Sequence, residues 1–186
     1  MAASGRVAAE LVNLSRLITE RISKLNPNRC VAVPMLTVKR FSQITNVRKV
    51  LEGMVTAEGA KTVEHSVIDH MAELNARMDR LDPGDHSTFL ELNRMFHFVI
   101  YQASGQGDII ELIEALWMQV GPLLDLLLTT PDQANKSRFI HHGELIEALR
   151  HGDAASASAA IASDIGDAAQ VILTQFKANE NRSPAP

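Results

Sequence analysis

The residues that most clearly indicate possible chemistry are an asparagine and a histidine four residues apart. In the segment LNRMFHFVI, Asn93 and His97 lie one turn from each other if the segment is helical. They share that helical face with Leu90 and Ile100. An amide oxygen and an imidazole at this spacing can bind one metal ion together. A buried, hydrogen-bonded histidine with Asn93 as its partner is the alternative, and the pair alone leaves both interpretations open.

A second histidine is selected by helical phase in the segment FIHHGELIEAL. Neighbouring residues of a helix point about 100° apart, so His141 and His142 cannot both face the core. His142 shares a face with the apolar residues that follow it, which are Leu145, Ile146 and Leu149. His141 lines up with Glu144 instead. We therefore expect His142 to point inward and His141 to be solvated.

A carboxylate stands beside an apolar stripe near the end of the chain. Asp164 follows Ile161 by three residues and lies next to the face that holds Ile165 and Ile172. A carboxylate near the interior of a helical bundle is costly unless it meets a cation, strong donors or water. Exposure to solvent is the alternative for Asp164, as it is for Asp167, and periodicity does not decide between the two.

If these side chains converge, three helices supply one set of nitrogen and oxygen ligands. The set consists of Asn93, His97, His142 and Asp164. It suits Zn²⁺, Ni²⁺, Mn²⁺ or another divalent ion. One carboxylate leaves such a site net positive, so it would attract an anionic small molecule whose carboxylate replaces metal-bound water. Two alternatives are a small metal-dependent enzyme, with Glu144 as the nearby carboxylate available as a general base, and a metal-free helical interaction protein.

The elements that must position these residues are helices. Apolar residues recur at spacings of three and four along long segments, with few prolines and glycines between them. The pattern predicts helices over 7–23, 37–62, 63–81, 87–103, 108–128, 132–150 and 153–176. Short connections indicate an all-α antiparallel bundle of about six or seven helices. The single short β-like run, 30–33, predicts a hairpin remnant after the first helix.

Composition narrows the class of protein. The chain has 186 residues, of which 46% are hydrophobic and 22% charged, as in a folded domain with at most one appendage. Its net charge of -4 and pI near 6.0 would repel a phosphate backbone, so DNA binding needs a local basic patch. The sequences HExxH and GxSxG and the phosphate-binding glycine signatures are absent.

The cellular compartment follows from features that the chain lacks. Cys30 is the only cysteine, which fits a reducing compartment. The first residues do not resemble a secretory signal, and the apolar stretch around 123–128 is too short to cross a bilayer. We expect a cytoplasmic protein without a membrane partner.

Three stretches carry family motifs. LTVKRFSQITNVRKVLEG contains Arg48, Leu51 and Glu52 in an R-x-x-L-E signature. LNRMFHFVIYQASGQGDIIELIEALW matches a stretch with an aspartate-x-x-x-histidine pair, and HHGELIEALRHGDAASA matches an H-x-x-L-I-x-A-L-x-x-G-D stretch that begins at His142. Together they resemble the FCD fold, the all-helical ligand-binding domain of the FadR subfamily of GntR transcriptional regulators, over roughly 36–175.

The resemblance implies a metal held by one aspartate and three histidines, with small organic acids as effectors that coordinate it. This chain departs from that pattern twice, because Asn93 stands at the aspartate position and Asp164 at the position of the third histidine. The set keeps one carboxylate, but an amide oxygen is a weaker ligand. The resemblance also assigns Arg48 to an effector carboxylate, with a surface arginine or one linked to Glu52 as the alternative.

The amino-terminal segment resembles the end of a winged helix-turn-helix. In AAELVNLSRLITERISKLNPNRCVAV, 8–20 resembles the recognition helix and 28–30 the wing tip. The preceding helices and the Ser-Arg-x-x-Val-Arg-Glu signature are missing, although Arg16 and Arg29 remain as candidate DNA contacts. We expect weak, nonspecific DNA binding at most unless the missing helices are present.

These observations predict three regions and one role. Residues 1–35 form the remnant of the winged helix-turn-helix, 36–178 the FCD-like helical domain, and 179–186 a disordered tail. The predicted role is effector sensing for a GntR/FadR-type regulator. We expect a homodimer that binds a divalent metal and a small carboxylate and is not an enzyme.

Overall fold

The computed structural model describes residues 36–128 and 133–180. All regular structure in those ranges is helical, which confirms the predicted all-α class. The six helices are α2 (Val38–Gly59), α3 (His65–Asp79), α4 (His86–Ala103), α5 (Gly107–Leu128), α6 (Gln133–Arg150) and α7 (Ala154–Glu180). The helix predicted over 7–23, the hairpin remnant, Arg16 and Arg29 lie outside the described residues.

Local side-chain caps start several helices close to the predicted positions. The Thr37 hydroxyl accepts a hydrogen bond from the Arg40 backbone N–H at 3.2 Å and caps α2. The Asp85 carboxylate caps α4, and the Asp153 carboxylate accepts from the backbone of Ser156 at 3.0 Å at the start of α7. Each cap satisfies a backbone donor that the first helical turn leaves without an intrahelical partner.

The last helix is longer than expected. α7 continues to Glu180, two residues into the predicted disordered tail of 179–186. The residues from 177 to 180 are Lys, Ala, Asn and Glu, and the first helix breaker after them is Pro184. The predicted boundary at 178 therefore falls inside a helix.

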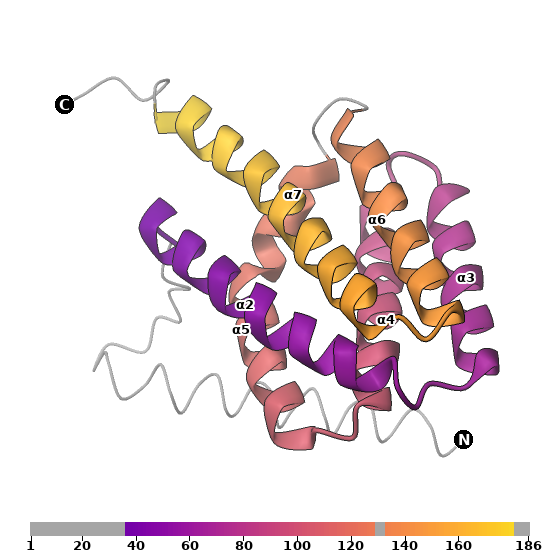
Figure 1. The fold of residues 1–186 in the computed structure, drawn as a ribbon. Helices are drawn as coiled ribbons and strands as arrows, with labels where there is room; N and C mark the ends of the chain where they lie inside the picture. The colour runs from indigo at the N-terminus through magenta and orange to yellow at the C-terminus, as the bar shows by residue number, and fades with distance from the viewer. Residues whose placement is uncertain (1–35, 129–132, 181–186) are drawn as a thin grey trace, which may run out of the picture. The chain divides into compact units, whose positions relative to one another are not determined.

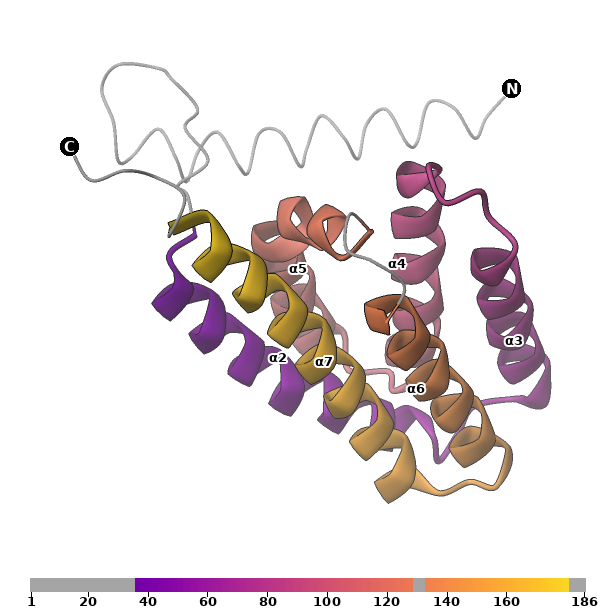
Figure 2. The same cartoon turned by 90° about the horizontal axis from the view of Figure 1, so that it is seen from above.

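Three of the other described helices, α2, α5 and α6, pack against α7. α2 and α7 run side by side in opposite directions (Figures 1 and 2), with Phe41 near Phe176 at one end and Gly53 beside Ser158 at the other. α6 covers another side of α7, and α3 packs against α4 and α6. α5 contacts α2, α4 and α7. Of the helices that carry the candidate ligands, α6 and α7 pack directly against each other, whereas α4 packs against α2, α3 and α5.

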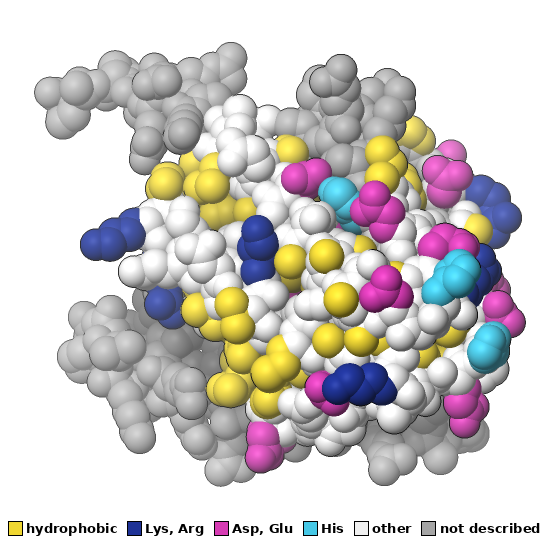
Figure 3. All heavy atoms as spheres, viewed as in Figure 1, with side chains coloured by type: hydrophobic (Ala, Val, Ile, Leu, Met, Phe, Trp, Pro, Cys, Tyr) yellow, Lys and Arg dark blue, Asp and Glu magenta, His cyan; other side chains and the backbone are white. Residues whose placement is uncertain are grey.

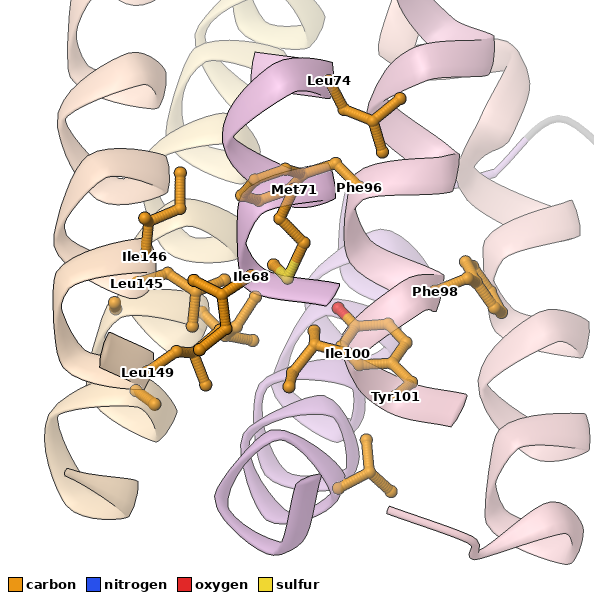
Figure 4. Packing of buried hydrophobic residues seen from close by; sticks show 14 of the residues in the cluster. Ile68, Met71, Leu74, Phe96, Phe98, Ile100, Tyr101, Leu145, Ile146 and Leu149 are labelled. Carbon is orange, nitrogen blue, oxygen red and sulfur yellow. The ribbon is translucent and has the colours of Figure 1, made fainter. Parts of the chain in front are cut away.

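Two apolar clusters form the interior. The larger one contains residues of all six described helices, and Met71, Phe96 and Leu145 of α3, α4 and α6 point toward one another within it (Figure 4). The smaller one joins α2, α5 and α7 through Ile44, Val120 and other residues. Polar side chains buried where these clusters meet must find partners inside the protein.

The outer surface is mixed. Hydrophobic side chains lie among charged ones on the face that α2 and α7 form (Figure 3). On α2, the exposed hydrophobic side chains are Val47, Val50 and Met54. Among the described helices, none combines the length and hydropathy needed to span a bilayer.

Candidate metal centre

The four side chains predicted as ligands meet in the interior. Asn93 and His97 of α4 and Asp164 of α7 line a cavity of about 30 Å³. His142 of α6 lies beside it, because one ligand atom each from His97, His142 and Asp164 falls within 4.8 Å of the others. All four residues are buried. The structure therefore brings together the whole predicted set.

The separations between these atoms resemble those around a bound ion. His97 Nε2 lies 3.5 Å from Asp164 Oδ2, and His142 Nε2 lies 3.8 Å from Asp164 Oδ1. Both exceed the usual length of a direct hydrogen bond, which is about 2.7–3.2 Å. Two ligands bound about 2.1 Å from a tetrahedral Zn²⁺ lie roughly 3.4 Å apart. The donor set accordingly fits a divalent cation.

The Asn93 amide supplies independent support for that fit. Its Oδ1 atom is buried and has no hydrogen-bond partner among the residues that the structure describes. Leaving a buried amide oxygen without a donor costs about 1–3 kcal/mol. A cation in the cavity that Asn93 lines would offset this cost.

Each histidine ring meets a polar side chain on its outer side. His142 Nδ1 lies 2.9 Å from Asn75 Oδ1, an amide oxygen that can only accept a hydrogen bond. His142 Nδ1 is therefore the donor, and in the neutral ring Nε2 keeps its lone pair toward Asp164. His97 Nδ1 lies 3.3 Å from the Tyr101 hydroxyl.

The charge state of His97 suits a metal ligand. Burial, together with the positive charge of Arg48, lowers the pKa of His97 from 6.5 to about 3. The ring is consequently neutral at physiological pH. A neutral imidazole nitrogen is the form that binds metal ions.

Arg48 lines the same cavity, but its guanidinium is already paired. Arg48 Nε donates to Glu52 Oε1 at 2.6 Å, and Nη2 donates to Glu52 Oε2 at 3.3 Å. The guanidinium carbon also lies 4.7 Å from the centroid of the Trp117 ring. This geometry matches the Glu52-linked alternative, so an effector carboxylate would have to share the guanidinium with Glu52.

Glu52 is the polar residue that the sequence analysis did not treat as functional. It is fully buried and accepts hydrogen bonds from Tyr101 at 2.6 Å and from Trp117 Nε1 at 3.0 Å, besides those from Arg48. Helical spacing could have predicted that Glu52 is buried. Glu52 lies four residues after Arg48 and three before Val55, on a face that also buries Ile44.

The expectation that His141 is solvated is wrong. Its side chain is only 16% exposed, with Nδ1 2.8 Å from Glu144 Oε2 and Nε2 3.0 Å from Asp167 Oδ2. Partial burial by itself would lower the pKa of His141, but the hydrogen bonds and charges of both carboxylates raise it. The flank of α6 is covered because α7 packs against it, which the periodicity of α6 cannot reveal.

The comparisons with known proteins agree with this fold and family. The FCD domain model matches residues 43–167, which is more than half of the chain, and the chain belongs to that family. The chain is 28% identical over 137 residues to the HTH-type transcriptional regulator McbR of Escherichia coli (strain K12), covering 72% of this chain and 61% of that protein. It thus spans about three fifths of the length of this relative.

A solved structure is similar as well. The structure of E. coli McbR/YncC has a TM-score of 0.71 to this chain at 22% identity, covering 77% of this chain and 68% of that one. This likeness confirms the FCD-like all-α fold. Because the sequence relative is a transcriptional regulator, the comparisons also support the prediction that the domain is not an enzyme.

Asn93→Leu is expected to stabilise the metal-free domain. Leucine has the same branched arrangement of heavy atoms and removes the buried amide oxygen that has no donor among the described residues. We expect the free energy of unfolding to rise by about 1–2 kcal/mol in the presence of a chelator, measured by urea denaturation. A loss of stability of similar size would show that the amide is satisfied in the metal-free protein and would remove this support for the cation site.

Proposed function

We propose that this domain senses a small carboxylic acid through a divalent metal ion and passes that signal to the DNA-binding part of a transcriptional regulator. Membership of the FCD family supports the regulatory role. One observation carries the metal-dependent part, namely that Asn93, His97 and Asp164 line one buried cavity and that His142 lies beside it.

The chemistry of the cavity supports a cation more than a purely structural polar cluster. Asn93 Oδ1 and the Asp164 carboxylate are acceptors, and His142 directs its Nδ1 proton away from the cavity, to Asn75. Acceptors that face one another in an apolar interior repel unless a positive charge lies between them. Zn²⁺, Ni²⁺ and Mn²⁺ all accept such a mixed nitrogen and oxygen set.

The bound ion would give the site its preference for anions. A divalent cation and the single carboxylate of Asp164 leave a net positive charge, because Arg48 and Glu52 neutralise each other. An effector carboxylate would replace water on the ion. Since a cavity of about 30 Å³ has room for little more than an ion and one or two waters, the effector must displace some of the lining side chains.

The metal site predicts a specific pattern of metal content. Protein stripped with a chelator, reloaded and desalted should retain about one divalent ion per chain, as measured by elemental analysis. His97→Ala and His142→Ala should retain much less, whereas the exposed His151→Ala should match the wild type. Asn93→Asp should bind about tenfold more tightly, because a carboxylate is a stronger ligand than an amide.

Equal metal content in the wild type and in the His97→Ala and His142→Ala variants would contradict the proposed site. If none of these proteins retained metal, the domain would be a metal-free helical interaction module, the alternative that the sequence also allows.

The sensing role predicts stabilisation by acids in the metal-loaded protein alone. A ligand that binds only the folded state at a hundred times its dissociation constant adds about 2.7 kcal/mol to the free energy of unfolding. We expect at least one acid from a panel of mono-, di- and tricarboxylates to raise the melting temperature of Zn²⁺-loaded protein. The corresponding amides, and the same acids with stripped protein, should have no effect. An equal shift in stripped protein would place the acid at a site without metal.

The proposed partners of the regulator are a second copy of the chain and DNA. The exposed Val47, Val50 and Met54 of α2 support self-association, and Arg16 and Arg29 are the candidate DNA contacts. Sedimentation velocity in the presence of a labelled DNA duplex measures both self-association and DNA binding. We expect a species of about twice the 20.4 kDa chain mass, with weak cosedimentation of DNA that decreases in Arg16→Ala/Arg29→Ala and disappears at high salt. A monomer, or tight salt-resistant DNA binding, would contradict these assignments.

A further inference from the structure

We propose that Glu52 and Tyr101 are positioning residues that hold His97 in the tautomer protonated at Nδ1. That tautomer directs the lone pair of Nε2 toward the cavity. The consequence for metal affinity rests on the proposed function, whereas the tautomer itself is a property of the metal-free protein.

The first step is the direction of the Tyr101 hydroxyl. Tyr101 is completely buried, and its oxygen lies 2.6 Å from Glu52 Oε2. The same carboxylate accepts from Arg48, and a hydrogen bond this short is typical of a hydroxyl that donates to a carboxylate. The only proton of the Tyr101 hydroxyl is therefore committed to Glu52.

The second step concerns His97. Its Nδ1 atom lies 3.3 Å from the Tyr101 oxygen, which can now only accept. Nδ1 must carry the proton if the two groups are to attract. Because a neutral imidazole has one N–H, Nε2 is then left with its lone pair.

The competing tautomer replaces the contact with Tyr101 by a longer one with Asp164. It would place the Nδ1 lone pair against the Tyr101 oxygen and direct Nε2–H at Asp164 Oδ2. That second separation is 3.5 Å, which is longer than an ordinary N–H···O hydrogen bond. The shorter of the two contacts, 3.3 Å against 3.5 Å, therefore favours protonation at Nδ1.

The two histidines are oriented in parallel ways. Asn75 accepts from His142 Nδ1, as Tyr101 accepts from His97 Nδ1, so an outer partner sets each ring for coordination through Nε2. Such partners commonly change metal affinity by about 10–100-fold when removed, although they do not touch the ion. Glu52 would thus affect the site from α2, a helix that supplies none of the four ligands.

The direct test is ¹⁵N NMR of the imidazole rings in metal-stripped protein, which distinguishes the protonated from the unprotonated ring nitrogen. The His97 signals are assigned by their loss in His97→Gln. We expect wild-type His97 to carry its proton on Nδ1. In Tyr101→Phe, which removes only the oxygen, we expect the proton to shift toward Nε2 and the affinity for Zn²⁺ to fall about 10–100-fold.

Thr56→Val is the matched control. Thr56 is also fully buried on α2, four residues after Glu52, and its hydroxyl has no hydrogen-bond partner within the described part of the chain. Its loss should change neither the tautomer of His97 nor the affinity for Zn²⁺. A change equal to that of Tyr101→Phe would assign both effects to general loosening of the core and overturn the proposal.

A double-mutant cycle tests whether Glu52 acts through Tyr101. In Glu52→Gln the amide can donate to the Tyr101 oxygen, which releases the hydroxyl proton toward His97 and favours the opposite tautomer. We expect this substitution to lower Zn²⁺ affinity in the wild type and to change it less than about twofold in Tyr101→Phe. Fully additive effects of the two substitutions on Zn²⁺ affinity would contradict the proposal that Glu52 acts through Tyr101. If Glu52→Gln does not fold, the tautomer of Tyr101→Phe still decides the matter.

The outcomes separate this proposal from the proposed metal site. Tight Zn²⁺ binding by a wild-type protein whose His97 is protonated at Nε2 would overturn the proposed role of Glu52 and Tyr101 but would agree with the metal site. An Nδ1–H tautomer that depends on Tyr101, in a protein that binds no Zn²⁺, would support the proposed role of Glu52 and Tyr101 and overturn the metal site.

Discussion

The burial of the Asp164 carboxylate beside two imidazoles and an amide oxygen is the constraint on which the rest of this domain depends. In an apolar interior these acceptors are stable together only when protons or a cation lie between them. The separations of 3.5 and 3.8 Å between Asp164 and the two histidines leave space for an ion. Relative to the ligand pattern that the family resemblance implies, the carboxylate of the candidate set lies on α7, at Asp164, and not on α4, where Asn93 stands.

A second layer of polar residues surrounds that set. Glu52 collects hydrogen bonds from three helices, through Arg48 of α2, Tyr101 of α4 and Trp117 of α5. A buried carboxylate with this many donors is satisfied internally, so it joins the helices without needing solvent. The same arrangement also accounts for the state of Arg48, which lies at the cavity but is neutralised by Glu52.

Helix boundaries and helix phase were accessible from the sequence because both depend on neighbouring residues. The Thr37 and Asp153 caps act within their own first turns, and α2 and α7 begin within a residue of the predicted positions. The inward direction of His142 follows from the apolar residues that come after it in the same helix. The extension of α7 to Glu180 was missed, although the sequence contains no helix breaker between Phe176 and Pro184.

The sequence by itself therefore determined the helical class, the family resemblance and which faces of α4, α6 and α7 carry the candidate ligands. Only the tertiary structure decided that Asn93, His97 and Asp164 line one cavity with His142 beside it, that Glu52 bonds to the Tyr101 hydroxyl next to His97 and that His141 joins α6 to α7. The physical reason is that a residue's direction around its own helix is a local property, whereas its distance to a side chain on another helix depends on how the helices pack. Tyr101 lies four residues after His97 on α4, so its contact with that ring is local, whereas Asn75 lies 67 residues before His142, on α3, and its contact depends on packing alone.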